Sequence, residues 1–479
     1  MNDKIADVIR RLDAADRQDI AKFTGISLPT ISSYITQENK DGGKVELNSN
    51  NSVSLRSDFC YYIGISIGTK ITRLCVIDFN FQVHKNEDLL SIFKEYQREA
   101  DFKSVDTESL LWYLPTPKTL EGFLFVFSLA IGIILNQFNL KIGGIGFSFP
   151  GAVDYANNVV VKCNCHPCLE GIRTTSILMP DIMETITQRD ITIAFESNAK
   201  ASIVAEKEFI ETTDKRRYKN AIKHENIACF SFGSSVSASY ILQNRLHRGV
   251  ENLSGRISYM IVPEQIFDIL EIKEKEQELE IKEKEKEHEL ELKEKANKNR
   301  VTYSTNNDLY IKWRKESNEK SNCKYEDCFK SRITLLYLFS KKRASAFNVQ
   351  IGNCGDVYDV IDKIEEKIKN KEPKLSPENI IDLKELKYWL LRRISRMFAW
   401  IASVHINMLS LDTIIFSGKA ANYFNDFFPF YLSDLKCLSY DNMDANASMI
   451  TSSKKETAPT IGAAICAYFG SNSYDTIEW

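Results

Sequence analysis

The stretch that most constrains the fold of this chain is 190–209, where a short β-rich run leads through polar residues into a helical pattern. Residues 191–195 are rich in β-branched and aromatic side chains, Glu196, Ser197 and Asn198 follow, and small and apolar residues then recur at helical spacing. This order is typical of an open α/β sheet, in which ligands bind at the carboxyl ends of strands. The polar turn is therefore a candidate site.

Length, charge and cysteine content narrow the class of protein. The chain has 479 residues, enough for about two to four domains. A formal net charge of −3 gives no general attraction to nucleic acid or membranes. The most apolar run, 123–135, is shorter than the roughly 20 residues of a spanning helix, so we expect a buried helix and no membrane. The first residues do not resemble a signal peptide, and we expect the 11 cysteines to be reduced in a cytoplasmic protein.

The first 40 residues have the pattern of a helix-turn-helix domain. Helical spacing predicts helices over 3–14, 17–23 and 28–37, with Gly25 in the turn and Ser27 as the cap of the third helix. A third helix of this kind reads the DNA major groove. The residues expected to face DNA are Ser27, Thr30, Ser33, Tyr34 and Gln37.

The charge of this domain favours a different interpretation. Residues 1–40 contain six Lys or Arg and six Asp or Glu, so they supply little of the phosphate neutralisation on which DNA affinity depends. A three-helix protein-interaction module is the alternative. Under the DNA hypothesis, dimerisation would supply the missing affinity.

Later segments indicate an α/β body. Polar residues 41–58 form a predicted wing or linker. Two β-rich runs within 61–83 flank a Gly-Thr-Lys turn and predict a hairpin, and 142–154 is an apolar strand that runs into Pro150 and Gly151.

Together these motifs resemble the ROK (repressor, ORF, kinase) family. The resemblance rests on the helix-turn-helix, the hairpin, GIGFSFPGAVD, FESNAKASIVAE, LDTIIFSGKAA and TIGAAICAYF, and covers residues 3–262 and 345–470. It implies an N-terminal all-α helix-turn-helix followed by a two-lobed actin-like ATPase body. The implied lobes are 59–185 and 186–479, with a charged insertion at 264–330 and a C-terminal helix that packs back on the first lobe.

The resemblance also implies that the chain does not phosphorylate sugars. Kinases of the family use an aspartate where this chain has Asn198, and an amide is not a useful base near pH 7. Ser66 stands in the place of an acidic residue, and the phosphate loop at 232–240 keeps only Gly233. One of two glycines that border the nucleotide remains, as Gly418. We therefore expect no catalytic residues and no cofactor.

The sugar-binding segment departs from the family as well. Arg256 takes the place of a glutamate and Tyr259 that of a histidine which normally binds zinc. The cysteines within 163–168 and the pair Cys323 and Cys328 lack an ordinary zinc spacing. We expect no metal, and Arg256 suggests a ligand with a carboxylate or phosphate.

The charged run at 271–295 has Glu-to-Lys pairs four residues apart and few apolar positions. It predicts a solvated helix or helical hairpin, with partner contact or a coiled coil as the alternative. A long amphipathic helix is predicted over 386–411.

The resulting hypothesis is a DNA-binding transcriptional regulator, most simply a repressor, that senses a carbohydrate in a non-catalytic kinase-like body. Its expected partners are operator DNA, a sugar or sugar derivative, and further copies of itself in a homodimer or homotetramer. The alternatives are a divergent sugar kinase and a non-catalytic interaction protein. The predicted ligand-binding residues are Pro150, Gly151, Ser197, Asn198, Arg256 and Tyr259.

Overall fold

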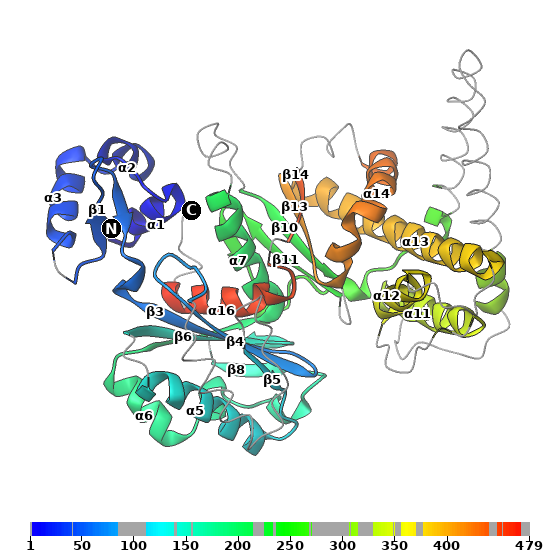
Figure 1. The fold of residues 1–479 in the computed structure, drawn as a ribbon, viewed down its shortest axis with the longest axis horizontal. Helices are drawn as coiled ribbons and strands as arrows, with labels where there is room; N and C mark the ends of the chain where they lie inside the picture. Colours follow the sequence, from blue (N-terminus) through cyan, green and yellow to red (C-terminus); the bar gives the residue numbers. More distant parts are fainter. Residues whose placement is uncertain are drawn as a thin grey trace, which may run out of the picture. The chain divides into compact units, whose positions relative to one another are not determined.

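The computed structural model consists of N-terminal helices followed by sheets covered by helices (Figure 1). It describes residues 2–40, 42–84, 112–137, 141–154, 157–213, 225–232, 236–267, 270, 306, 308–314, 329–347, 349, 356–369, 377–439, 448–452 and 454–470. The predicted charged helix at 271–295, most of the insertion 264–330, Cys323, Cys328 and the loop residues 233–235 lie outside this set. The expected α/β class with an N-terminal helical domain is confirmed.

The N-terminal domain is a bundle of three helices with a small β-hairpin. Its elements are α1 (Asn2–Leu12), α2 (Arg17–Thr24), α3 (Leu28–Glu38), β1 (Val45–Leu47) and β2 (Val53–Leu55). The Asp16 carboxylate accepts a hydrogen bond from the Asp19 N–H at 2.7 Å and so caps α2. Gly25, at φ 69°, ends α2, and the Ser27 hydroxyl accepts from the Thr30 N–H at 3.4 Å at the start of α3.

Arg10 of α1 attaches this domain to the body. Its guanidinium carbon lies 3.9 Å from the ring centre of Phe81 and 4.6 Å from that of Tyr468, and its Nε donates to the Phe79 carbonyl at 3.0 Å. Asp7, one turn earlier, pairs with the Arg10 guanidinium at 2.7 Å and accepts from the Tyr468 hydroxyl at 3.2 Å. Arg10 is 5% exposed, so these contacts are shielded from water.

The first sheet of the body has the strand order β5-β4-β3-β6-β9. Its strands β3, β6 and β9 are parallel, and the predicted hairpin is present as the antiparallel pair β3 and β4. The bounds are β3 (Tyr61–Ile67), β4 (Ile71–Ile77), β5 (Trp112–Pro115), β6 (Ile142–Phe149) and β9 (Thr192–Ser197). Every residue of β3 is buried, as expected for a strand covered on both faces.

Helices cover both faces of this sheet. Figure 1 shows α5 and α6 on one face and α16 on the other, with α7 beside α16. The bounds are α5 (Leu120–Gln137), α6 (Pro180–Gln188), α7 (Asn198–Thr213) and α16 (Ala458–Phe469). In α5, which contains the apolar run 123–135, Phe123 and Phe127 are fully buried. No helix in the described part of the chain has the length and apolarity that a membrane crossing requires.

The C-terminal helix α16 lies against the sheet with backbone in contact with backbone. A Cβ atom on Gly146 of β6 would lie 1.7 Å from the Ala463 carbonyl oxygen, and one on Gly462 would lie 1.7 Å from the Ala201 carbonyl oxygen. Only glycine fits at these two positions, because real Cβ atoms do not approach that closely. Small residues therefore set how closely α16 approaches β6 and α7.

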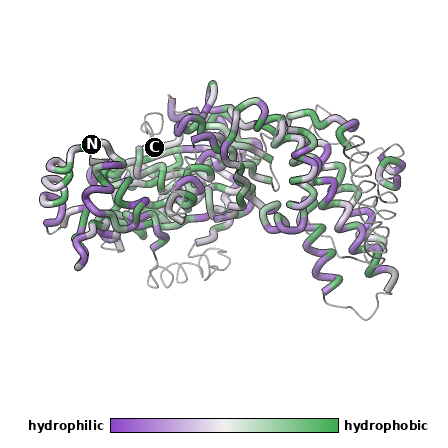
Figure 2. The backbone as a smooth tube through the Cα atoms, turned by 90° about the horizontal axis from the view of Figure 1, so that it is seen from above, coloured by the Kyte–Doolittle hydropathy of each residue, from purple (hydrophilic) through white to green (hydrophobic). Residues whose placement is uncertain are grey.

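The second sheet has the order β12-β11-β10-β13-β14, with β10, β13 and β14 parallel and β11 and β12 antiparallel. The strands are β10 (Ile227–Phe232), β11 (Val236–Leu242), β12 (Arg245–His247), β13 (Thr413–Ser417) and β14 (Ser448–Thr451). The accompanying helices are α11 (Phe329–Ser345), α12 (Val357–Lys369), α13 (Pro377–Leu409) and α14 (Phe424–Leu438). The predicted amphipathic helix 386–411 lies in α13 up to Leu409, and Figure 2 shows hydrophobic and hydrophilic residues mixed along the described backbone.

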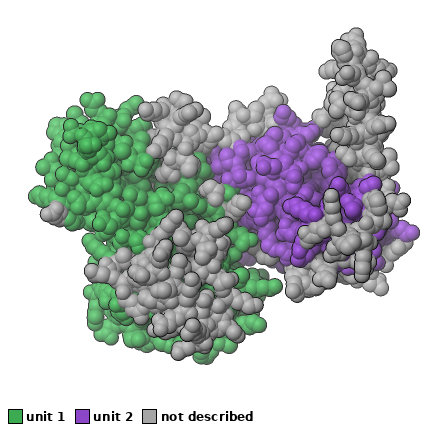
Figure 3. All heavy atoms as spheres, in the orientation of Figure 1, with its two compact units in different colours: residues 1–225, 239–254, 452–479 green, residues 226–238, 255–451 purple. Residues whose placement is uncertain are grey.

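The chain divides into two compact units (Figure 3). Unit 1 comprises 1–225, 239–254 and 452–479, and unit 2 comprises 226–238 and 255–451. This division differs from the lobe boundary expected at 185/186. The reason is that β9 pairs with β6 and α7 packs on α16, so both elements belong to unit 1.

Candidate ligand-binding site

Two strand ends meet at one edge of the first sheet. Strands β6 and β9 are parallel and in register, with Ser148 opposite Glu196 and Phe149 opposite Ser197. Pro150 and Gly151 follow β6 directly. The carboxyl ends of parallel strands are where open α/β sheets bind ligands. Four of the predicted ligand residues (Pro150, Gly151, Ser197 and Asn198) therefore follow or end neighbouring strands of unit 1.

Glu196 is the central buried charge at this edge, and it is 1% exposed. One carboxylate oxygen accepts from the Ser197 N–H at 2.7 Å and from the Asn252 side-chain amide at 3.2 Å. The other accepts from Arg248 Nε at 3.3 Å. Arg248 and Glu196 thus form an ion pair. Glu196 and the three residues that donate to it all belong to unit 1. These hydrogen bonds fix the carboxylate as a structural group.

Several buried oxygen atoms next to Glu196 have no hydrogen-bond partner among the described residues. They are Ser197 Oγ, Asn198 Oδ1 and Asn252 Oδ1. The amide nitrogen of Asn198 donates to the Ile67 carbonyl at 2.9 Å, which leaves its oxygen as an acceptor. Since buried polar atoms are nearly always hydrogen-bonded, these three atoms are suited to a ligand or water that supplies O–H or N–H groups.

The loop that carries Asn252 is held by a buried lysine. Lys200 of α7 is 2% exposed, and its ammonium group donates to the carbonyls of Asn252 at 3.1 Å and Ser254 at 3.5 Å. Glu251 and Asn252 both have positive φ, at 53° and 57°. This uncommon backbone persists only where surrounding contacts impose it, so the loop presents Asn252 in a fixed position.

The remaining two predicted ligand residues belong to unit 2. Arg256 is exposed and precedes the short 3-10 helix η5 (Ile257–Tyr259), and Tyr259 is 44% exposed. Neither contributes to the Glu196 cluster. Sequence reasoning missed Arg248, Asn252 and Lys200, which do. No motif marks them, although an Asn in the short segment after Gly249 is a signal for the left-handed backbone found there.

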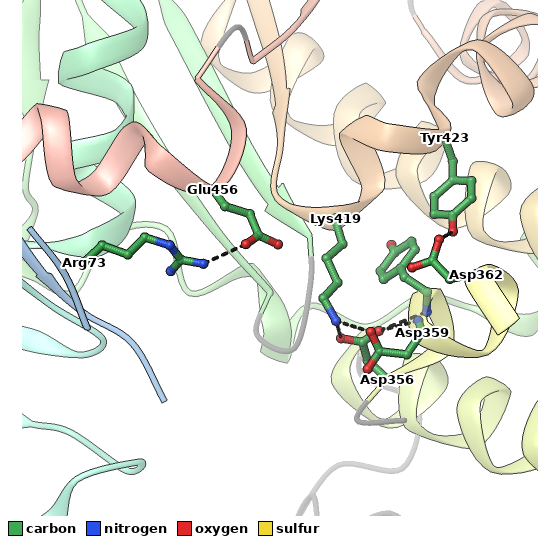
Figure 4. A network of polar contacts seen from close by, with 8 residues as sticks. Arg73, Asp356, Asp359, Asp362, Lys419, Tyr423 and Glu456 are labelled. Atoms are coloured by element: carbon green, nitrogen blue, oxygen red, sulfur yellow. Dashed lines mark hydrogen bonds and ion pairs between the residues drawn. The ribbon is translucent and has the colours of Figure 1, made fainter. Parts of the chain in front are cut away.

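Two positions that the motif resemblance associates with nucleotide or phosphate, Ser66 and Gly418, lie next to internal contacts. The Ser66 and Thr460 hydroxyls are hydrogen-bonded to each other at 2.7 Å in a buried position of unit 1. In unit 2, the Lys419 ammonium group next to Gly418 pairs with Asp356 at 2.9 Å and with Asp359, and the Tyr423 hydroxyl contacts Asp362 (Figure 4). Lys419 is thereby held by two carboxylates of unit 2. In unit 1, Arg73 pairs with Glu456 at 2.7 Å.

The predicted DNA-facing residues of α3 divide into two groups. Ser27, Ser33 and Gln37 are exposed and Thr30 is partly exposed. Tyr34 is 7% exposed, so the expectation that it faces solvent was wrong. It shares the buried face of α3 with Ile31 and Ile35, at the three- and four-residue spacing of a helix. Of the five predicted DNA-facing residues, Ser27, Thr30, Ser33 and Gln37 therefore reach the surface.

Among the described residues, no three His, Cys, Asp or Glu side chains are grouped as metal ligands would be. The loop Cys163–Cys168 adjoins the candidate ligand residues, because Cys165 Sγ lies 3.8 Å from the Pro150 carbonyl oxygen. The His166 ring contacts the Gly68 carbonyl at 2.8 Å, which ties this loop to the turn of the β3–β4 hairpin.

Comparison with known proteins gives no sequence match: neither a protein-family model nor a curated protein matches the chain. Solved structures do match. A ROK family transcriptional regulator, a homologue of the E. coli Mlc protein, aligns over 99% of this chain and 98% of its own, with TM-score 0.56 and 12% identity. The chain has the ROK fold.

Sugar kinases with the same fold align with a smaller part of this chain. A ROK family glucokinase from Streptomyces griseus, solved with glucose and AMPPNP, covers 86% of this chain and is itself covered completely, with TM-score 0.51 and 14% identity. A glucokinase from Parabacteroides distasonis covers 86% of this chain with 99% of its own, TM-score 0.52 and 11% identity. The resemblance expected from the motifs is thus confirmed at the level of the fold.

Proposed function

We propose that the protein is a DNA-binding transcriptional regulator whose ROK-fold body binds a carbohydrate without phosphorylating it. The observation that carries this proposal is coverage: the regulator aligns with 99% of the chain, whereas each glucokinase leaves about a seventh of it unaligned. That difference is about the size of the N-terminal domain. Its three helices and hairpin are the part that a sugar kinase does not need.

The body supplies acceptors for a sugar. Ser197 Oγ, Asn198 Oδ1 and Asn252 Oδ1 are uncharged oxygens, and each can accept a hydrogen bond from a sugar hydroxyl. The fixed loop around Asn252 and the rigid strand ends hold these atoms in place before a ligand arrives, which reduces the entropy cost of binding. Arg256 and Tyr259 are further candidate ligand residues, and Arg256 would favour an acidic sugar.

Two features argue against phosphoryl transfer. Asn198, at the position of the kinase base, cannot take a proton from a sugar hydroxyl near pH 7 and uses its amide nitrogen to bind the Ile67 carbonyl. Lys419, beside the remaining nucleotide-site glycine, is paired with Asp356 and Asp359 of its own unit. The proposal therefore has no catalytic residue.

The DNA-binding half of the proposal is tested by genome-wide recovery of DNA bound to the full-length protein. We expect an enriched set of promoter sites, and a double variant, Ser33→Ala with Gln37→Ala, that loses about 1–3 kcal/mol of specific affinity per lost base contact. Gln18→Ala is the matched control, because Gln18 is an exposed polar residue on α2. If no promoter set is enriched, the interaction-protein alternative is favoured and the regulator proposal fails.

The ligand half is tested by a thermal-shift screen of neutral and acidic sugars. A sugar that binds should raise the unfolding temperature in proportion to its occupancy. Asn252→Ala should weaken that shift by removing an acceptor, while Asn157→Ala, an exposed asparagine of unit 1, should not. If no sugar of either class stabilises the protein, the sensor function is wrong.

A divergent sugar kinase is the competing enzyme hypothesis, favoured by the glucokinase alignments. It requires sugar-dependent ATP consumption that disappears in Asn198→Ala. We expect no sugar-dependent consumption in either protein. We further propose that the regulator is a cytoplasmic homodimer or homotetramer, since paired DNA-binding domains would compensate for the neutral charge of each one.

A further inference from the structure

Cys163 and Cys165 lie in one short loop of unit 1, between β8 (Val159–Lys162) and the 3-10 helix η2 (Pro167–Leu169), and Cys168 lies in η2 itself. The His166 N–H bonds the Cys163 carbonyl at 2.9 Å, so residues 163–166 form a tight β-turn. This turn brings Cys163 and Cys165 together, with a single residue between them.

The turn is fixed from three sides. The Cys163 N–H donates to a Glu170 carboxylate oxygen at 2.9 Å, the His166 ring contacts the Gly68 carbonyl at 2.8 Å, and Cys165 Sγ lies 3.8 Å from the Pro150 carbonyl. These contacts fix the backbone of the turn and the place of the Cys165 side chain.

The two thiols are not equivalent. Cys163 is 0% exposed and belongs to the hydrophobic core, whereas Cys165 is partly exposed. The Cys163 thiol donates a hydrogen bond to the Cys165 sulfur, and this bond is the main reason that the pKa of Cys165 falls below its ordinary value; the His166 ring and the Thr69 hydroxyl add to the effect. The same bond, together with burial, raises the pKa of Cys163. A partly exposed thiol with a lowered pKa thus lies beside a buried thiol with a raised pKa.

Neither a metal site nor ordinary core packing accounts for this arrangement. No group of metal-ligating side chains occurs within the described residues. Cysteines that serve only as small apolar residues are inert because burial keeps them protonated, and Cys165 departs from that pattern. An accessible thiolate with a neighbouring thiol is the arrangement found in oxidation-sensitive sites.

We propose that Cys165 and Cys163 form an oxidisable dithiol in which a peroxide converts the two thiols into an intramolecular disulfide. The Cys165 thiolate attacks one oxygen of hydrogen peroxide, an S–O bond forms while the O–O bond breaks, and hydroxide leaves. The Cys163 sulfur then displaces the hydroxyl group of the sulfenic acid. An S–S bond forms, the Cys163 proton leaves with that hydroxyl as water, and the two sulfurs together have lost two electrons to the peroxide.

Such a bridge closes a very small ring and is strained, and strained disulfides are readily reduced. A dithiol reductant therefore restores the two thiols. The bridge removes the S–H group of Cys165 that faces the Pro150 carbonyl, so oxidation acts directly beside the turn that follows β6.

The test treats the full-length protein with hydrogen peroxide, then unfolds it in denaturant so that N-ethylmaleimide can block every free thiol, the buried one of Cys163 included, and digests with trypsin. All three cysteines fall in one tryptic peptide, 163–173, because Lys162 precedes it and Arg173 ends it. We expect the untreated peptide to carry three maleimides. After oxidation it should carry one, on Cys168, and lack two hydrogen atoms, and dithiothreitol should restore the untreated pattern.

Variants distinguish the cysteine that attacks the peroxide from the cysteine that completes the disulfide. Cys165→Ser should abolish the oxidation, and Cys163→Ser should stop at a sulfenic acid on Cys165 that dimedone traps. Cys437→Ser, a partly buried cysteine in α14 of unit 2, should leave the bridge unchanged. A bridge to Cys168, persistence of the bridge in Cys165→Ser, or no peroxide-dependent change would overturn the proposal. The assay detects thiols alone, so its result does not depend on the regulator function.

Discussion

The contact of Arg10 with the body gives the sharpest stability prediction. In Arg10→Ala the Phe79 carbonyl and the Asp7 carboxylate lose a charged donor, and the Phe81 and Tyr468 rings lose the guanidinium between them. A hydrogen bond to a charged group contributes about 1.5–3 kcal/mol, and a desolvated cation–π contact about 2 kcal/mol. These contributions come from one side chain and do not add. The expected loss of stability is therefore that of removing one partner of a buried ion pair.

We therefore expect Arg10→Ala to lower the free energy of unfolding of unit 1 by about 3–5 kcal/mol. Arg10→Lys should lose less, because it keeps the charge but not the planar group that stacks on the rings. Lys4→Ala is the matched control on the same helix, since Lys4 is exposed and its loss should change stability by less than about 0.5 kcal/mol.

Urea unfolding followed by far-ultraviolet circular dichroism measures the difference, and limited proteolysis at low urea locates it. If the reasoning is right, Arg10→Ala also exposes the segment 42–58 to protease before the rest of unit 1 unfolds. An unfolding free energy for Arg10→Ala within about 0.5 kcal/mol of the parent protein would refute it.

Three further predictions follow from contacts described above. Gly462→Ala should lower the free energy of unfolding by more than the roughly 1–3 kcal/mol of ordinary overpacking, because its Cβ would meet the Ala201 backbone. Calorimetry of this variant beside Ala467→Gly checks that the loss of stability comes from the close contact. Glu196→Ala should destabilise unit 1 by about 3 kcal/mol, since Arg248 then loses a buried partner, and a urea midpoint equal to that of the parent would contradict this. Burial lowers the pKa of His405 from 6.5, so the unfolded chain binds the proton more readily than the folded one. Stability that is present above pH 6.5 should therefore be lost as the pH falls below 6.5. His405→Gln should flatten this dependence of the unfolding free energy on pH, as measured by pH-jump unfolding.

Helical and strand periodicity predicted most of the elements near the N terminus and in the first sheet. The three helices begin within about two residues of the expected positions, because caps such as Ser27 and the turn at Gly25 are local signals. Tyr34 shows the limit of such signals. Tyrosine is common on both buried and exposed faces, and only the packing of α3 against the rest of the domain determines which applies.

The site was less predictable because its residues come from distant parts of the chain. The strand end at Glu196 was identifiable from sequence, but Arg248 and Asn252 lie more than 50 residues later and have no distinctive spacing. The lobe boundary was displaced for a similar reason. Pairing of β9 with β6 is a long-range contact, and an apolar strand does not indicate its neighbour.

The position of α16 in the sequence has a consequence for synthesis on the ribosome. Unit 1 is assembled from three separate chain segments, and the last of them supplies α16, on which β3 and β6 pack, and Tyr468, which encloses Arg10. Residues near the start therefore wait for residues near position 460 before their contacts are complete. A nascent chain that stops before α16 lacks both the helix that covers one face of the first sheet and the Tyr468 ring that packs on Arg10. Premature termination should therefore yield a chain that proteases remove instead of a partly working protein.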